Sequence, residues 1–354
     1  MAVKSVLVWQ WGRRGAGPRI AVDLANALAT LPDVSVQLSL SDQAEILHSH
    51  HAPKDVLVVR TYQSALGLAA RFLQAPFIIT RLFLTLLRKR PDVAICAMPA
   101  PLDVLMAHAL RRAGVKVVTI VHDARPHPGD GYPLQMALQK ALIGQSSLLV
   151  TFSQHVADVL SGDTICRRKP MLSLSHPPFI GTDAPPPFTH GGRPRLLMFG
   201  RLLPYKGLDL LADALSQLET PVECRIIGKG PRSPELGRLA SLAGVTVENR
   251  WVPEDELARL IAWADVLLLP YREASQSGVG AMAAAGGRYV IATRVGGLTE
   301  QFSENSQALL CDPNGPCIAA AITQLLAEPP PIAPIPDSTG AWQELGRHIL
   351  NAVR

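Results

Sequence analysis

Short runs of apolar, β-favouring residues alternate with segments of helical periodicity along all 354 residues, and this alternation restricts the folds open to the chain. The runs are nearly continuous in apolar residues, as expected for strands covered on both faces, and the alternation is typical of a parallel sheet with crossover helices. In the first half we expect strands at residues 6–9, 34–38, 56–59, 93–97, 115–121 and 147–152, and helices at 19–30 and 102–113. In the second half we expect strands at residues 196–199, 223–227, 245–249, 266–269 and 289–292, and helices at 208–218, 234–243, 254–263 and 279–285.

Two stretches rich in proline interrupt this alternation. Residues 176–195 have no periodicity and mark a linker, and residues 328–336 precede a final helical segment. We therefore predict an α/β protein with two Rossmann-like, doubly wound domains. The predicted boundaries are a first domain at 1–175, the linker at 176–195, a second domain at 196–335 and a C-terminal helix at 336–354 that packs back towards the first domain. Open α/β sheets bind ligands beyond the carboxyl ends of their strands, so we expect the two domains to face a cleft.

The composition excludes several classes of protein. With 48% hydrophobic and 18% charged residues, the chain is too apolar to be disordered. Its five cysteines are odd in number and form no CxxC pair, which argues against a zinc site or a disulfide framework. The first apolar run is too short for a signal peptide, and no uncharged apolar stretch reaches the ~18 residues of a membrane-spanning helix. We expect a cytoplasmic protein, either soluble or peripheral on the inner face of the membrane.

The net charge of +5 is unevenly distributed. Residues 1–175 carry 19 Lys and Arg against 11 Asp and Glu, a net +8, whereas residues 176–354 carry 15 against 18, a net −3. The basic half either meets an anionic partner or presents a solvated face. Within it, residues 76–90 are apolar and end in a basic cluster, Arg88-Lys89-Arg90. This segment is either a helix that lies on an anionic membrane or a core helix whose cations suit its dipole. Nucleic acid is not expected as a partner, since no basic patch is interleaved with aromatic residues.

Three loops at predicted strand ends contain residues suited to binding anions. The first, from Trp11 to Arg19, is rich in glycine and precedes a helix, but it matches neither the dinucleotide fingerprint nor a P-loop, and a simple tight turn is the alternative. The second contains Arg201 and Lys206, which together suit a diphosphate unless they are merely solvated charges at a helix entry.

The third loop follows the expected strand at residues 266–269. The backbone N–H groups of Ser277 to Val279 would lie in the first turn of a helix rich in small residues, where a phosphate binds favourably. Glu273 can accept hydrogen bonds from sugar hydroxyls, or it is simply a solvated carboxylate. Another polar stretch, residues 122–128, lacks regular metal-ligand spacing, and we interpret it as a loop that contacts substrate.

These segments resemble glycosyltransferase family 4. The resemblance is strong over residues 195–310 and rests on FGRLLPYKGLDLLADAL, IIGKGP and WADVLLLPYREASQSGVGAMAAAGGRYVIATRVGGLTE, with AWQEL trailing them. It is weaker over residues 1–175, where the glycine-rich loop and Val121-His122-Asp123 are the main matches. The resemblance implies the GT-B architecture of two facing Rossmann-like domains, and a retaining, metal-independent enzyme. It also implies an acceptor-binding first domain and a second domain that binds the nucleotide-sugar.

The resemblance also implies roles for individual residues. Arg201 and Lys206 would bind the donor diphosphate, and Glu273, the first glutamate of the family's E-x7-E motif, would bind hydroxyls of the transferred sugar. His122 matches the position that contacts this sugar and would position it. Further matches to family positions that contact donor or acceptor are Gly15 and Ala16 in the glycine loop, Gly228 beside the base, and Gln276, Ser277, Gly278 and Val279 around sugar and phosphate.

The sequence departs from the family at position 281, where Ala281 replaces the second glutamate of the motif, the usual ligand of the donor ribose. We interpret this as a variant donor site. The predicted function is sugar transfer from a nucleotide-sugar to a glycan or lipid-linked acceptor, in polysaccharide or glycolipid synthesis, with no metal and no cofactor beyond the donor. The alternatives are a catalytically silent nucleotide-sugar-binding partner, prompted by Ala281, and an epimerase or phosphorylase on the same fold.

Overall fold

The computed structural model describes residues 3–49, 53–88, 90–131, 134–179 and 184–353. Lys89 of the basic cluster and residues 180–183 of the predicted linker lie outside the described residues. The chain forms two compact units. Unit 1 consists of residues 1–125, 132–177 and 338–354, and unit 2 consists of residues 126–131 and 178–337.

Unit 1 is built on a seven-stranded parallel sheet with the order β3-β2-β1-β4-β5-β6-β7. Its strands are β1 (Lys4–Gln10), β2 (Val34–Ser41), β3 (Val56–Val59), β4 (Val93–Cys96), β5 (Lys116–Val121), β6 (Leu148–Thr151) and β7 (Met171–Ser173). The chain first builds outward from β1 to β3 and then returns to the other side of β1 with β4. The point where the strand order reverses therefore lies between β1 and β4, which is where such sheets bind ligands.

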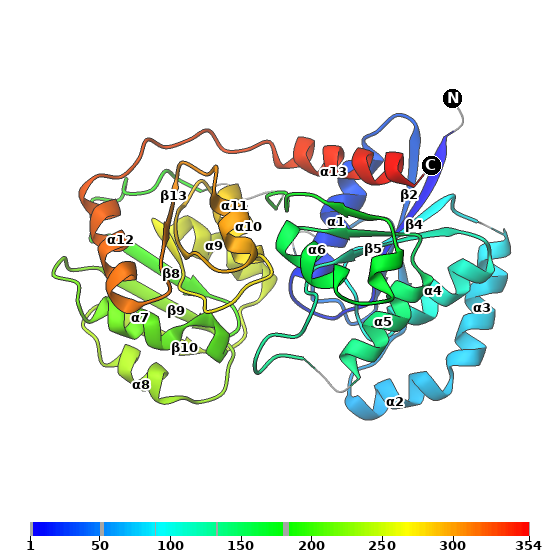
Figure 1. Cartoon of the computed structure of the whole chain (residues 1–354), viewed down its shortest axis with the longest axis horizontal. Coiled ribbons are helices and arrows are strands. Elements are labelled where there is room, and N and C mark those ends of the chain that lie inside the picture. The colour runs from blue at the N-terminus through cyan, green and yellow to red at the C-terminus, as the bar shows by residue number, and fades with distance from the viewer. Residues whose placement is uncertain (1–2, 50–52, 89, 132–133, 180–183, 354) are drawn as a thin grey trace. The chain divides into compact units, whose positions relative to one another are not determined.

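Helices cover both faces of this sheet. They are α1 (Ala16–Ala29), α2 (Ala65–Leu73), α3 (Ala75–Arg88), α4 (Asp103–Arg112), α5 (Gln135–Gln145), α6 (Gln154–Ser161) and α13 (Ser338–Ala352). The last of these, drawn in red in Figure 1, packs against α1 although more than 300 residues separate them. A Cβ on Gly346 of α13 would lie 2.5 Å from Cδ2 of Leu28, and Gln343 Nε2 donates a hydrogen bond of 2.7 Å to Thr30 Oγ1.

Unit 2 contains a six-stranded parallel sheet with the order β10-β9-β8-β11-β12-β13. Its strands are β8 (Arg195–Phe199), β9 (Glu223–Gly228), β10 (Val245–Asn249), β11 (Val266–Leu269), β12 (Tyr289–Thr293) and β13 (Ala308–Cys311). Its helices are α7 (Leu208–Leu215), α8 (Pro234–Ala240), α9 (Glu254–Trp263), α10 (Gly278–Ala285), α11 (Gly297–Phe302) and α12 (Gly315–Ala327). Here the strand order reverses between β8 and β11.

The predicted α/β class with two doubly wound parallel sheets is confirmed. Central strands such as β4 and β11 are apolar at every position and buried at every position, as the sequence indicates. The pattern missed elements at the sheet margins, among them β7 and β13, whose residues are only half-buried and therefore carry a weak apolar signal. The predicted helix at 76–90 is α3, and of its described residues only Leu86 is buried.

Candidate functional site

The residues predicted to bind the donor lie on two loops that leave neighbouring strands of unit 2. Arg201 and Lys206 follow β8, and Glu273 follows β11. These are the two strands between which the order of the sheet reverses. In open α/β sheets, ligands bind beyond the carboxyl ends of the strands at such a reversal of the strand order.

Glycines allow backbone contact between these two loops and between the loop after β8 and the end of β9. A Cβ on Gly228 would lie 1.6 Å from the carbonyl oxygen of Gly200, which has a φ of 118°. A Cβ on Gly207, with a φ of 67°, would lie 1.8 Å from the carbonyl oxygen of Pro270. No other residue fits at these positions without moving backbone. Gly228 is thus required for packing, and its predicted place beside the base stays a prediction.

The two predicted diphosphate ligands are held against buried tyrosines. Lys206 Nζ lies 3.6 Å from the centroid of the Tyr271 ring and 5.0 Å from that of Tyr205. Arg201 Nη2 donates a hydrogen bond of 3.3 Å to Tyr205 Oη. Burial raises the pKa of the Tyr271 hydroxyl to about 12, so this ring stays neutral beneath the ammonium group. The aromatic faces orient Lys206 without neutralising its charge, and the Tyr205 hydroxyl orients Arg201.

A short segment, residues 126–131, is part of unit 2 and contacts the predicted sugar ligand. His127 Nδ1 donates a hydrogen bond of 2.8 Å to Glu273 Oε1. The His127 ring is stacked on Tyr205, with a centroid distance of 4.5 Å and an interplanar angle of 19°. The sequence interpretation of residues 122–128 as a substrate loop did not anticipate this contact.

The same segment also contacts the predicted diphosphate ligand. The carboxylate of Asp130 forms an ion pair with Arg201. Its other oxygen accepts a hydrogen bond of 2.8 Å from the backbone N–H of Gly131. A single turn in unit 2 therefore contacts both Glu273 and Arg201.

The predicted phosphate cradle lies at the start of α10. Ser277 is the N-cap, and its hydroxyl accepts a hydrogen bond of 3.2 Å from Gly280 N. The backbone N–H of Ser277 donates to Gln301 Oε1 at 2.9 Å, so this N–H is already engaged within the protein. Gly278 and Val279, the first two residues of the helix, retain the position expected for an anion. Gln276 is buried just before them.

Ala281 lies on the buried side of α10, with 3% of its surface exposed. Its backbone N–H donates to Ser277 O at 3.1 Å, so the helix continues regularly through this position. The departure from the family motif therefore changes a side chain and leaves the path of the helix intact.

In unit 1, the glycine-rich loop connects β1 to α1. Gly15 caps the helix with a φ of 82°, and Ala16 is the first helical residue. Two flanking glycines, Gly12 and Gly17, border the side chain of Gln10, where an added Cβ would lie 2.5 and 2.6 Å from Gln10 Nε2. The first turn of α1 contains no acidic residue, which favours an anion at this end of the helix.

His122 follows directly after β5 and contacts a second histidine, His176, the first residue of the predicted linker. His122 Nδ1 lies 3.1 Å from Asp123 Oδ2. Its ring meets the buried ring of His176 edge-on, with centroids 6.4 Å apart. His176 packs in turn on Phe152 and Trp342 and donates from Nδ1 to Pro177 O at 2.6 Å. Burial, reinforced by His122, lowers the pKa of His176 to about 3.

Asp103 is a further residue that the sequence did not single out. It is fully buried at the start of α4, and one carboxylate oxygen accepts a hydrogen bond of 3.0 Å from the backbone N–H of Trp11, the first residue of the glycine-rich loop. The other accepts from Ala100 N at 2.8 Å. Burial raises its pKa to about 7. Asp103 thus connects the loops after β1 and β4. The sequence does not reveal this role, because aspartate is common at the start of any helix.

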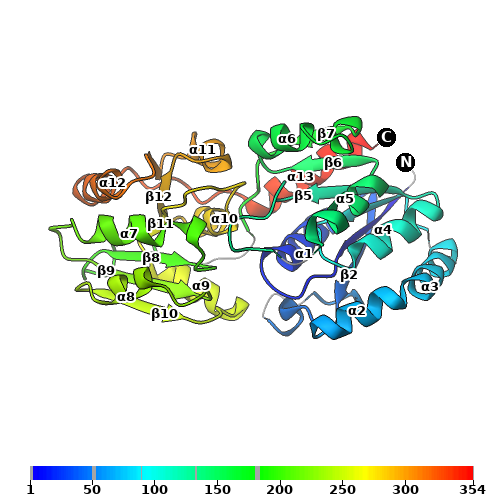
Figure 2. The same ribbon diagram turned by 60° about the horizontal axis from the view of Figure 1, so that its bottom comes forward.

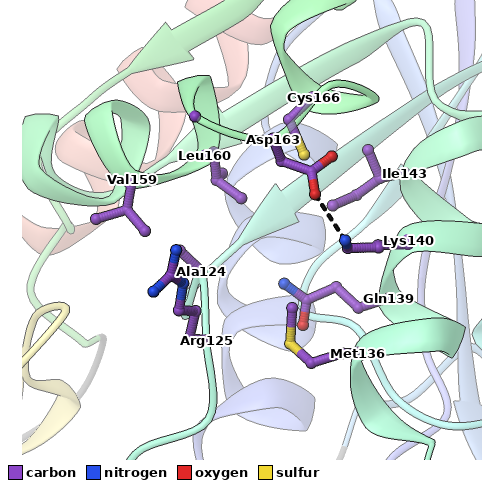
Figure 3. Close-up of a pocket in the computed structure, with 11 residues that line it drawn as sticks. Ala124, Arg125, Met136, Gln139, Lys140, Ile143, Val159, Leu160, Asp163 and Cys166 are labelled. Atoms are coloured by element: carbon purple, nitrogen blue, oxygen red, sulfur yellow. Dashed lines mark ion pairs between the residues drawn. The ribbon is translucent and has the colours of Figure 1, made fainter.

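A separate cavity of about 150 Å³ lies in unit 1 between α5 and α6 (Figure 3). It combines apolar walls such as Ile143 and Leu160 with an ion pair between Lys140 and Asp163, whose Nζ and Oδ2 atoms are 2.7 Å apart. Ala124 and Arg125, from the predicted substrate loop at 122–128, line it, and none of the individual residues predicted to bind the donor does.

The residues that the structure describes offer neither a metal-ion cluster nor a single membrane-spanning helix. Those residues contain no cluster of three or more His, Cys, Asp or Glu side chains suited to a metal ion. Among them, no single helix is long and apolar enough to span a membrane, and α2 and α3 satisfy that test only as a pair bent by 67°.

Comparison with protein families identifies the chain. The model of Glycosyltransferase Family 4 matches residues 17–171, and the model of Glycosyl transferases group 1 matches residues 193–328. The chain belongs to glycosyltransferase family 4. This confirms the family predicted from the sequence motifs, and it extends the assignment to the first half of the chain, where those motifs are weak.

Curated relatives of this family-4 protein include transferases that act on lipids and on inositol phosphate. The GDP-mannose-dependent alpha-(1-6)-phosphatidylinositol monomannoside mannosyltransferase of Mycolicibacterium smegmatis is 32% identical, over 65% of this chain and 66% of that protein. The D-inositol 3-phosphate glycosyltransferase of Jonesia denitrificans is 34% identical over 37% and 34% of the two chains. The GDP-mannose:glycolipid 4-beta-D-mannosyltransferase of Xanthomonas campestris pv. campestris is 33% identical over 28% and 30%. The matches span about two thirds of the first relative and about a third of the other two.

Known structures share the fold at low identity. Sucrose-phosphate synthase from Thermosynechococcus elongatus superposes with a TM-score of 0.66 at 16% identity, covering 99% of this chain and 94% of that one. The lipopolysaccharide outer core galactosyltransferase WaaB gives 0.64 at 14% identity, covering 99% and 98%. UDP-GlcNAc 2-epimerase from Neisseria meningitidis gives 0.60 at 13%, covering 98% and 100%. Since transferases and an epimerase share this fold, the fold by itself does not assign the reaction.

Proposed function

We propose that this family-4 protein transfers a hexose from a nucleotide-sugar to a glycan or lipid-linked acceptor, with retention of the anomeric configuration. The observation that carries the proposal is the set of side chains at the strand-order reversal of unit 2. Arg201 and Lys206 supply positive charge there, and Glu273 supplies a hydrogen-bond acceptor for sugar hydroxyls. The relatives' names make GDP-mannose the first donor to test.

In the proposed reaction, the bond between the anomeric carbon and the diphosphate oxygen breaks and a bond to the acceptor oxygen forms on the same face. The acceptor proton passes to the departing phosphate oxygen. Negative charge grows on the diphosphate as the bond breaks, and Arg201, Lys206 and the start of α10 stabilise it. We propose that these groups take the place of a metal ion. Glu273 accepts hydrogen bonds from hydroxyls of the transferred sugar, and the role proposed for His122 is to position this sugar.

We further propose that unit 1 binds the acceptor at an anionic membrane surface, through α2 and α3. Figure 2 shows these helices following each other along one side of unit 1. One side of α3 packs on the core of unit 1, whereas several large apolar side chains of the pair are exposed. The exposed ones are Leu66 (85%), Leu73 (86%), Phe77 (70%), Leu84 (55%) and Leu87 (56%).

Charge supports a bilayer as the partner of this helix pair. Residues 56–91 contain six Lys and Arg and no Asp or Glu. Apolar side chains among cations suit insertion at the headgroup level of an anionic membrane, where each cation near the surface adds about 1 kcal/mol. Flotation with vesicles of phosphatidylglycerol and phosphatidylcholine at low salt tests this part; absence of binding would contradict it.

The transferase proposal is tested by mixing the whole protein with GDP-mannose, UDP-glucose and other nucleotide-sugars and measuring donor hydrolysis and transfer to a lipid extract. We expect Lys206→Ala to lower turnover by roughly 10²–10³-fold, because it removes a cation from the developing charge. Glu273→Ala should raise KM for the nucleotide-sugar and lower turnover. Arg294→Ala, an exposed arginine of unit 2 outside the two loops, is the matched control.

Two results would overturn the proposal. One is full activity in both variants. The other is binding of nucleotide-sugar by the wild type with no turnover on any acceptor, which favours the silent binding protein suggested by Ala281. Conversion of the bound sugar to its epimer, detected by NMR, would instead favour an epimerase.

A further inference from the structure

Residues 127–130 form a tight turn whose sequence accounts for its shape. Asp130 N donates a hydrogen bond of 2.9 Å to His127 O, closing a four-residue turn. Pro128 occupies the second position, and Gly129, with a φ of 79°, occupies the third. Proline followed by glycine in this conformation is typical of a type II turn, because its third residue needs a positive φ. The turn brings the first and fourth residues close together, and both contact side chains proposed to bind the donor.

The two ends of the turn are held very differently. The His127 side chain is 12% exposed, because its ring is stacked on Tyr205. The Asp130 side chain is 23% exposed, and it forms an ion pair with Arg201, whose side chain is 45% exposed. The histidine is thus held by packing as well as by its hydrogen bond. The aspartate is held mainly by its ion pair with Arg201, whose guanidinium a ligand can reach.

A bound donor would affect these two contacts in opposite ways. A diphosphate carries more negative charge than a carboxylate and binds a guanidinium through two oxygens. It therefore displaces the carboxylate of Asp130 from Arg201. His127, by contrast, occupies Oε1 of Glu273 and leaves the second carboxylate oxygen for a sugar hydroxyl, so both bonds can exist together.

We infer that the 127–130 turn is part of the donor site: His127 is a positioning residue for Glu273, and Asp130 competes with the donor diphosphate for Arg201. This inference rests on the proposed function, since it takes Arg201 and Glu273 as donor ligands. It assigns roles to His127, within the polar stretch at 122–128, and to Asp130, two residues beyond that stretch. It also predicts that substitutions at the two ends of one turn change donor binding in opposite directions.

Asp130→Asn tests the competing carboxylate. Calorimetric titration of the whole protein with GDP and with UDP should show binding about three- to tenfold tighter than in the wild type, since an accessible ion pair no longer has to be broken. Asp158→Asn, an exposed aspartate on α6 in unit 1, should leave the affinity unchanged. Unchanged or weaker binding by Asp130→Asn overturns the role of Asp130. If the wild type binds neither nucleotide, the proposed function fails instead.

His127 is tested by two variants that separate its contacts. His127→Phe keeps the ring on Tyr205 and loses the hydrogen bond, whereas His127→Asn keeps a donor near the Nδ1 position and loses the ring. His127→Phe should lower kcat/KM for GDP-mannose hydrolysis by about 10- to 100-fold, since the lost bond is to a charged group, and should leave GDP affinity within twofold. His127→Asn should recover part of the activity. Equal losses in both variants, or a parallel loss of GDP affinity, show a purely structural role and overturn the inference.

Discussion

The two units fix their candidate binding loops by different means. In unit 2, the loops after β8 and β11 contact neighbouring backbone directly, and Gly207 and Gly228 leave no space for a Cβ. In unit 1, side chains hold the corresponding loops: Asp103 accepts the N–H of Trp11, and His176 supports His122 from behind. Where backbone contacts backbone directly, only glycine fits. A loop that is held by side chains can be anchored by several residue types. Unit 2 therefore has the more recognisable sequence.

The same contrast extends to ionisation. Within the described residues, the pKa values moved to about 7 and about 3 belong to Asp103 and His176, both buried in unit 1. The large shifts in unit 2 fall on groups such as Tyr271 and Cys224, whose pKa values rise to about 12 because they are buried. Unit 1 thus carries two buried groups whose protonation changes between pH 3 and pH 7. Tyr271 and Cys224 of unit 2 stay protonated over that range.

The largest expected effect comes from adding a methyl group to a glycine of unit 2. Gly228→Ala places a Cβ 1.6 Å from a backbone oxygen, so β9 or the loop after β8 must move, and we expect a loss of about 4 kcal/mol or more in the free energy of unfolding. The matched change in unit 1 is Gly144→Ala in α5, where nothing lies within 4 Å and alanine is the better helix former. Urea unfolding of both variants measures the difference, and similar effects in the two units would contradict the comparison.

The next effect concerns pH and is confined to unit 1. Burial raises the pKa of Asp103 from 3.8 to about 7, so the folded state holds its proton more tightly and this group's contribution to stability falls as pH rises through that range. Burial lowers the pKa of His176 from 6.5 to about 3, so the unfolded state binds the proton more tightly and this contribution rises with pH. Each group changes the free energy of unfolding by about 2–4 kcal/mol over its range, and the two changes oppose each other in the wild type.

Single substitutions should reveal each slope. Relative to the wild type, Asp103→Asn should gain unfolding free energy as the pH rises from 4 to 7, because only the histidine slope remains. His176→Asn should lose unfolding free energy over the same range. Urea unfolding at four pH values measures both differences, and differences that do not vary with pH would show that these groups do not titrate as proposed.

Much of this molecule could be predicted from local sequence, and the reason is visible in particular residues. Buried strands such as β11 are apolar at every position, and loops such as that of Arg201 and Lys206 lie between a strand and a helix that both have clear patterns. Short marginal elements such as β7 were missed, because half-buried residues give little contrast with their neighbours.

The contacts that complete the candidate site depend on partners distant in sequence. The hydrogen bond between His127 and Glu273 joins residues 146 positions apart, and the contact of His176 with Trp342 joins two others far apart in the chain. Nothing in the sequence near His127 identifies its partner. A turn with Pro128 and Gly129 predicts that the first and fourth residues approach each other, but only the fold shows which unit they contact.

The smallest expected effect tests whether exposed apolar residues have different roles in the two units. The double variant Leu66→Gln, Leu73→Gln removes two highly exposed side chains from α2 and should reduce binding to phosphatidylglycerol vesicles by about tenfold or more, because each leucine gains from leaving water. Ile332→Gln removes a side chain of unit 2 that is 51% exposed and should leave vesicle binding unchanged. All three side chains lie at the surface, so neither variant should lose thermal stability. Equal losses of vesicle binding would mean that the bilayer does not distinguish unit 1 from unit 2, and the assignment of the membrane surface to α2 and α3 would fail.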